Sequence, residues 1–326
     1  MWFESLTGFR EVRGDDVAAR FVVEDGRLTS RANGRTMQHG RFEIPTLAEL
    51  RQRCSTAAGV GTLRRREVVA DVQDLHADPT NAGAFFQVAS QLNTLEMSSP
   101  EVTPDDGIDR YEHDHTQGPA CAIACGAGTI YRNYLVPMAD SIGQSRDRQI
   151  NCLADLVAEL GIDIPVVNGY ACPTAAQLAQ LHALLADADE ASRDRLMGYL
   201  RIGLQWDTEV TLGDAGHLLT QAYCSAMPMA YCRHSPEQWE PLARLVLDAA
   251  YEATLSAAVG NAEATGNPTV YLTLVGGGAF GNPAEWILDA LERALRLFDD
   301  ADLDIAVVSY GSANPDLRRV LPPSGS

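Results

Sequence analysis

The sequence predicts an α/β fold in which helices cover both faces of a sheet. Two observations predict it: apolar, β-branched runs recur along the chain, and segments with helical periodicity separate them. The C-terminal part is the clearest. A helix is expected from Ser235 to Gly260, followed by a strand at 269–275, a helix at 283–298 and a last strand at 303–311.

The N-terminal 60 residues alternate between polar and apolar positions and contain Asp-Gly, Asn-Gly and His-Gly pairs, which indicate hairpins. We therefore expect residues 1–60 to form an extension of strands and turns that packs on a core domain at 61–326. That domain begins with strands expected at 66–72 and 82–92. Helical segments at about 140–200 are expected to form an insertion in it.

The composition limits the classes of function. A formal net charge of −19 argues against a nucleic-acid partner, because a face that binds phosphates is normally basic. Every basic side chain of the Lys and Arg class is arginine, which excludes a P-loop lysine and Schiff-base chemistry. Seven scattered cysteines without a Cys-x-x-Cys pair are typical of reduced thiols. With no signal-peptide pattern and no long apolar run, we expect a cytoplasmic protein without a membrane partner.

A glycine loop, Gly276-Gly277-Gly278-Ala279-Phe280-Gly281, precedes the helix at 283–298. Glycines let the backbone approach a ligand without a Cβ clash. Asn282 as N-cap and Pro283 as first residue would start the helix, whose free N–H groups favour an anion such as a diphosphate. A plain tight turn is the alternative. The letters also fit Gly-x-Gly-x-x-Gly, but a dinucleotide fold needs several strand–helix units after this loop, and only one follows.

The segment 98–119 is polar, is broken by prolines and is expected to form a long loop. Clustered carboxylates raise one another's pKa, as a general acid requires. The alternative is a loop of solvated acids. The side chains that could carry chemistry here are Asp105, Asp106, Asp109, Tyr111, Glu112 and Asp114.

Two other groupings of reactive side chains stay open at this point. His113, His115, Cys121 and Cys125 have the ligand types of a zinc site, but free cysteines are common in apolar stretches such as ACAIAC, and we predict no metal. His217 and Cys224 have the types of a Cys/His nucleophile, although nothing in the sequence brings them together.

With these motifs in view, the chain resembles the macrodomain family. The segment 242–311, with its glycine loop, is similar to the second half of a macrodomain, and VVADVQDLHADPTNAGAFFQVASQLNTLE (68–96) is similar to the first half. The resemblance implies a three-layer α/β/α fold with a mixed sheet, and it implies ADP-ribose as the ligand without a further cofactor.

The resemblance also implies which residues contact ADP-ribose. The chain departs from the family in two ways: the usual Asn-Ala-Ala-Asn is not in register, and the acidic segment replaces a glycine-rich loop. The implied positions are Asp71 and Tyr310 at the adenine, the glycine loop with Asn282 at the diphosphate, and Gln87, Ser90, Gln91 or Asn93 near the distal ribose. Ordinary packing at the strand end is the alternative for Tyr310, and Phe280 could pack on the distal ribose or cover the core.

One branch of the family is similar in its acidic loop. It is related to a Legionella effector that removes ADP-ribose from arginine on ubiquitin, and it uses aspartates in this loop. The resemblance implies an ADP-ribosyl-protein hydrolase that acts on an arginine-modified protein, either ubiquitin-like or of another kind. Asp114 is expected first as the water-activating or substrate-orienting group, with Asp106 second and Tyr111 beside them; oxocarbenium-like transition states require such carboxylates. A non-catalytic ADP-ribose reader and a nicotinamide-dependent oxidoreductase are the alternatives.

Overall fold

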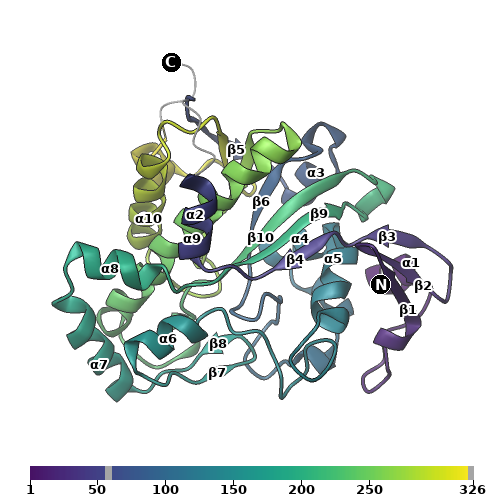
Figure 1. Ribbon diagram of the computed structural model, residues 1–326, viewed down its shortest axis with the longest axis horizontal. Coiled ribbons are helices and arrows are strands. Elements are labelled where there is room, and N and C mark those ends of the chain that lie inside the picture. Colours follow the sequence, from purple (N-terminus) through teal and green to yellow (C-terminus); the bar gives the residue numbers. More distant parts are fainter. Residues whose placement is uncertain (56–60, 322–326) are drawn as a thin grey trace.

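The computed structural model describes residues 1–55 and 61–321, and a seven-stranded mixed sheet lies at its centre (Figure 1). β5, β12, β11, β6 and β10 run parallel to one another, whereas β9 is antiparallel to β10 and to the edge strand β4. In spatial order the strands are β4 (Arg41–Glu43), β9 (Gly203–Glu209), β10 (Leu218–Cys224), β6 (Phe85–Ala89), β11 (Thr269–Leu272), β12 (Asp304–Ser309) and β5 (Arg64–Val69).

Helices cover both faces of this sheet. On one face α2 (Leu47–Ser55) and α10 (Ala284–Leu297) pack against the long α9 (Pro236–Thr265). On the other face lie α3 (Val72–Ala77), with α4 (Gln117–Ala124) against β6 and α5 (Gly126–Ile130) against β9. The three-layer α/β/α arrangement with a mixed sheet is therefore confirmed, and it is consistent with the macrodomain-like fold that the resemblance implies.

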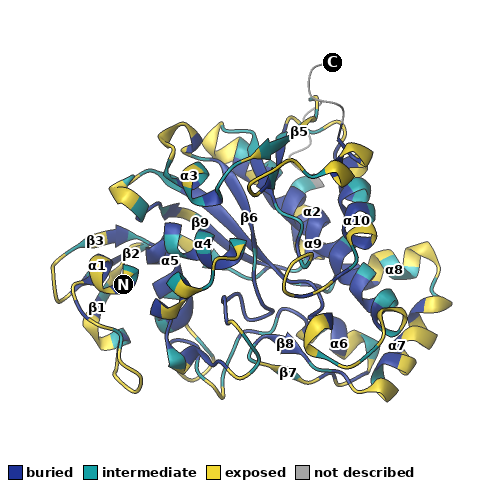
Figure 2. Ribbon diagram, turned by 180° about the vertical axis from the view of Figure 1, so that it is seen from behind, coloured by how far each residue is buried: buried dark blue, intermediate teal, exposed yellow. Residues whose placement is uncertain are grey.

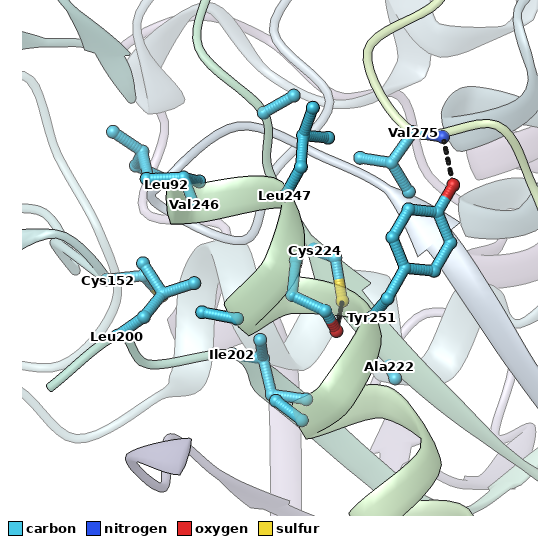
Figure 3. Close-up of a cluster of buried hydrophobic side chains, with 14 of the residues drawn as sticks. Leu92, Cys152, Leu200, Ile202, Ala222, Cys224, Val246, Leu247, Tyr251 and Val275 are labelled. Carbon is cyan, nitrogen blue, oxygen red and sulfur yellow. Dashed lines mark hydrogen bonds between the residues drawn. The ribbon is translucent and has the colours of Figure 1, made fainter. Parts of the chain in front are cut away.

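The core lies between the sheet and the two helical layers. Figure 2 shows β6 as buried, whereas the outer faces of α7 (Ala175–Ala186) and α8 (Glu190–Met197) are exposed. Figure 3 shows part of this core, which includes Val246 and Leu247 of α9 and Ala222 and Cys224 of β10. The Cys224 sulfur contacts the Ala250 carbonyl of α9. Such burial of apolar area is the main favourable contribution to folding.

The helical region expected at about 140–200 contains α6 (Ala154–Leu160), α7 and α8, with a short hairpin of β7 (Val166–Val167) and β8 (Tyr170–Ala171) between α6 and α7. α7 and α8 pack on α9. Among the described residues, no helix combines the length and apolar character needed to cross a membrane.

The described part of the N-terminal segment, residues 1–55, contains the expected strands and also contributes a strand and a helix to the layers around the main sheet. α1 (Trp2–Thr7) precedes a three-stranded antiparallel sheet of β1 (Phe21–Glu24), β2 (Arg27–Ser30) and β3 (Thr36–Gln38). β4 then pairs with β9 in the main sheet, and α2 packs on α9. One hydrophobic core includes side chains from both sides of the expected boundary.

Two helix boundaries differ from the sequence expectation. α9 continues through Gly260 to Thr265 and ends at Gly266, whose φ of 74° suits a left-handed C-cap. Gly260 sits in open space, so nothing there forces the helix to stop. α10 begins at Ala284 with Pro283 as its N-cap, because Asn282 is engaged in the preceding loop.

Candidate functional site

Two adjoining hollows lie at the carboxyl ends of the parallel strands, which is where open α/β sheets bind ligands. The inner hollow, of about 190 Å³, is lined by the glycine loop and by residues that follow β6. The outer hollow, of about 820 Å³, is lined by residues that follow β5 and β12 and is in the size range of ligand pockets. Both hollows share Asp114, Thr116, Gln117, Thr273 and Leu274.

The glycine loop forms one wall of the inner hollow and is anchored from behind. Gly276 has a φ of 80°, and a Cβ there would overlap with the side chain of Ala226, so glycine is required. Asn282 Nδ2 donates to the carbonyls of Met227 (2.8 Å) and Gly276 (3.3 Å). Of the six loop residues, Gly276, Gly278, Ala279 and Phe280 line the hollow, whereas Gly277 and Gly281 do not.

α9 also fixes the start of this loop. Tyr251 Oη donates to the Thr273 carbonyl (2.8 Å) and accepts from the Val275 N–H (3.2 Å), as Figure 3 shows for Val275. A buried tyrosine that both donates and accepts is fully satisfied. The loop therefore presents its backbone to the hollow from a rigid support.

The most unusual group in the inner hollow is Glu96, which the sequence analysis did not select. Its residue surface is only 4% exposed, and Oε1 has no hydrogen-bond partner among the described residues. Burial, and to a smaller extent the charge of Asp114, raise the pKa of this carboxyl well above its usual range, although Arg132 acts in the opposite direction. Glu96 therefore favours its neutral, proton-carrying form.

Asp114 lies in both hollows, at the end of the 3-10 turn Asp109–His113. Its Oδ1 accepts from the backbone N–H of Thr116 (3.0 Å) and from the Thr116 hydroxyl (2.7 Å), which holds the entry to α4. Gln117 ties that helix to β6 by donating to the Gln87 carbonyl (2.9 Å) and accepting from the Ala89 N–H (2.9 Å). Asp114 is thus held beside Glu96 by backbone contacts.

The other carboxylates of the acidic segment hold the loop in place. Asp106 caps the turn that begins at Thr103 and pairs with Arg13 (3.1 Å), so it lines neither hollow, contrary to its expected place beside Asp114. Asp109 accepts from the Phe3 N–H. In the same way Asp105 accepts from the Arg146 N–H and Glu112 from the Trp2 N–H.

Tyr111 contacts Glu96 directly but cannot supply a proton near neutral pH. Its hydroxyl accepts from the Glu96 N–H at 2.9 Å. Burial raises the pKa of Tyr111 far above its ordinary value. The side chain lies at the edge of the outer hollow and supports the turn that carries Glu96.

The residues expected at the adenine lie together in the outer hollow. Asp71 is the N-cap of α3, since its Oδ1 accepts from the Gln73 N–H at 2.8 Å. Tyr310, which follows β12, is 82% exposed and lines the same hollow. An exposed aromatic ring at a pocket rim offers a stacking surface for a base.

Of the residues expected near the distal ribose, two line the inner hollow and two form hydrogen bonds behind it. Ser90 and Gln91 line the inner hollow, where Gln91 Oε1 also accepts from the Met97 N–H (2.6 Å). Gln87 lies inside the core and donates to Thr254 (3.0 Å), and Asn93 donates to Gln149 (2.9 Å). Neither Gln87 nor Asn93 lines a hollow.

The described residues do not bring together the side chains of the other two groupings, the zinc-type ligands and the Cys/His pair. Cys121 and Cys125 are buried in the core, where burial raises the pKa of both thiols, and the described residues contain no metal-binding group of three or more His, Cys, Asp or Glu side chains. Cys224 contacts Thr254 and the Ala250 carbonyl, and no contact joins it to His217 among the described residues.

Comparison with known proteins gives structural neighbours only. No family model matches the sequence, and no curated protein does. A variant of poly(ADP-ribose) glycohydrolase from Deinococcus radiodurans, in complex with ADP-ribose, is 11% identical, with 86% of this chain and 91% of that chain covered and a TM-score of 0.46. A second variant of the same enzyme is 9% identical, with 86% of this chain and 94% of that chain covered and a TM-score of 0.48. The Thermomonospora curvata enzyme, bound to the inhibitor ADP-HPD, is 12% identical over 89% of each chain, with a TM-score of 0.41. At such low identity the similarity assigns no ligand, activity or residue role to this chain.

Proposed function

We propose that this protein binds ADP-ribose and hydrolyses the glycosidic bond at its distal ribose. The observation that carries the proposal is the buried carboxyl of Glu96 in the inner hollow, beside Asp114 and opposite the glycine loop. Two carboxyl groups in different environments, one neutral and one able to carry charge, are what glycoside hydrolysis requires.

The shape of the site supports the assignment of the ligand. The outer hollow would take the adenosine, with Tyr310 against the base and Asp71 at its edge. The glycine loop would face the diphosphate, since free backbone N–H groups favour anions. The distal ribose would then enter the inner hollow next to Glu96 and Phe280.

In the proposed reaction, Glu96 donates its proton to the leaving atom as the bond to the anomeric carbon breaks. Water, oriented by Asp114, adds its oxygen to that carbon and gives its surplus proton to the Asp114 carboxylate, from which the proton passes to solvent. Glu96 regains a proton from solvent, so the products are ADP-ribose and the free acceptor. The charge of Asp114 would stabilise the oxocarbenium-like transition state.

We propose arginine as the first acceptor to test. A guanidinium leaving group pairs naturally with carboxylates, and Asp114 stands at the junction of the two hollows. Glu112, at the rim of the outer hollow, adds a second carboxylate on the same side. An ADP-ribosylated protein would be the partner under this proposal.

The test measures release of ADP-ribose over time from three substrates: a protein modified on arginine, a protein modified on glutamate, and poly(ADP-ribose). The wild type is compared with Glu96→Gln and with Asp114→Asn, and ADP-ribose binding is titrated in parallel. Release that both substitutions abolish supports the proposal, and the preferred substrate identifies the linkage. Binding without release would indicate a reader module, and absence of both would refute the ligand assignment.

A further inference from the structure

Arg132 is a fully buried arginine on the π-helical turn Tyr131–Leu135. Its guanidinium carbon lies 3.6 Å from the centre of the Tyr223 ring, and Nη2 donates to Thr129 Oγ1 (3.2 Å). Nη1 has no hydrogen-bond partner, and no ion pair within the described part of the chain includes Arg132. The positive charge is therefore buried without a direct counterion.

Such an arrangement is unfavourable for stability. An uncompensated charge in a protein interior costs several kcal/mol even after relaxation and stacking on an aromatic ring. Buried arginines that serve the fold alone are normally paired with a carboxylate. The position of Arg132 therefore requires an explanation other than packing.

Arg132 also contacts the turn that carries Glu96. Its Nε donates to the Thr94 carbonyl at 3.1 Å. Thr94 has a φ of 63°, which is unusual for a β-branched residue and persists only where neighbours hold it. Gln144 supports the same turn from Nε2, which donates to the Asn93 carbonyl (3.1 Å) and to the Arg132 carbonyl (3.1 Å). Glu96 follows two residues after the strained position.

Arg132 is the basic side chain that interacts with the Glu96 carboxyl. Glu96 Oε1 and Arg132 Nη1 are both buried and both lack a partner among the described residues. No direct ion pair joins the two side chains, but the Arg132 charge acts on the Glu96 carboxyl through the low-dielectric interior. The titratable and charged groups that interact with Glu96 are Arg132, Asp114, Tyr111, Cys121, Tyr170 and Tyr223.

We infer that Arg132 is a positioning residue for Glu96: it fixes the strained turn through the Thr94 carbonyl, and its guanidinium is held buried on the Tyr223 ring without a direct counterion. The inference deepens the proposed function and rests on it for its kinetic part. While Glu96 is neutral, the Arg132 charge is uncompensated. When Glu96 gives its proton to the leaving atom, the buried pair becomes neutral overall, so the interaction is stronger late in the reaction than at its start.

The experiment titrates Glu96 directly and does not depend on turnover. Protein labelled with ¹³C at the glutamate carboxyl is followed by NMR across the pH range, and the Glu96 signal is assigned by its loss in Glu96→Gln. In Arg132→Gln, which keeps donors for Thr94 but removes the charge, the pKa of Glu96 should rise further. In Arg132→Lys the charge remains, and the pKa should stay near the wild-type value.

The matched control is Arg293→Met, because Arg293 pairs with Glu252 (2.7 Å) on the opposite face of the sheet. It should leave the Glu96 signal and the hydrolysis rate unchanged. Arg132→Gln should lower kcat by at least about tenfold while ADP-ribose affinity is retained, because Arg132 lines neither hollow. A Glu96 pKa that is unchanged in Arg132→Gln, or shifted equally in Arg293→Met, would overturn the inference. A shifted Glu96 pKa in a protein that hydrolyses none of the substrates supports the role of Arg132 and refutes the proposed function alone.

Discussion

Replacing Glu96 by glutamine keeps the volume of the side chain but removes the proton that the inner hollow can supply. The carboxyl is 4% exposed, and burial raises its pKa well above 4.5. In the proposed mechanism this group acts as the general acid. We therefore expect Glu96→Gln to lower kcat by about 10²–10⁴-fold while the affinity for ADP-ribose is retained.

The same substitution has a predictable effect on stability. Because the folded-state pKa is raised, the native protein binds more protons than the unfolded chain between pH 4.5 and that pKa. The free energy of unfolding of the wild type therefore falls as pH rises, by about 1.4 kcal/mol for each pH unit in this window. Glutamine does not titrate, so the variant gains stability relative to the wild type over the same range.

Urea denaturation of both proteins at several pH values between 5 and 8, together with the ADP-ribose release assay, measures both effects. The pH–rate profile of the wild type should lose activity on its alkaline side, since the acid form of Glu96 is needed. Equal stability differences at pH 5 and pH 8 would show that Glu96 titrates normally. Substantial turnover by Glu96→Gln would refute its role as the proton donor.

Four further substitutions separate the site from its surroundings. Gly118→Ala should reduce turnover and destabilise the fold by about 1–3 kcal/mol, since its Cβ would overlap with the Ala89 carbonyl and the Glu96 carboxyl group. Gly260→Ala, in open space within α9, should instead stabilise the fold by about 0.5–1 kcal/mol in thermal unfolding. Asp106→Asn should leave kcat unchanged in the release assay and reduce stability by about 1 kcal/mol, because the carboxylate caps a turn, pairs with Arg13 and lines neither hollow. Tyr310→Ala should weaken ADP-ribose binding about 2–12-fold in calorimetry without a change in stability, since the ring is 82% exposed.

The elements with strong periodicity were predictable because their pattern is local. The strand at 303–311 corresponds to β12, the helix at 283–298 to α10, and the strand at 82–92 to β6. The predicted end of α9 at Gly260 was wrong. A glycine inside a helix is only mildly unfavourable, and the packing of α9 against the sheet outweighs that cost. The position of residues 41–43 in the main sheet could not be predicted, since strand pairing between distant segments leaves no local pattern.

The candidate site was only partly accessible from the sequence. Part of the glycine loop, Asp71, Tyr310 and Asp114 line the two hollows. The glycine loop was selected for its place between a strand and a helix, and the three single residues through the macrodomain resemblance and the acidic loop. Glu96 was missed, although one signal was present: it is the first acidic residue after a buried strand, within an otherwise uncharged segment. An acidic residue in such a segment is worth selecting as a candidate buried carboxyl.

The sequence by itself determined the α/β class, the strands and helices of the C-terminal part and the glycine loop, because each depends on residues that are near one another in the chain. The tertiary structure decided which carboxylate matters. Asp106 and Asp114 are similar in sequence context, yet one pairs with Arg13 at the surface and the other stands beside Glu96. Burial and the electrostatic field at a side chain arise from segments far apart in sequence, such as Arg132 and Tyr111 around Glu96, and only the fold brings them together.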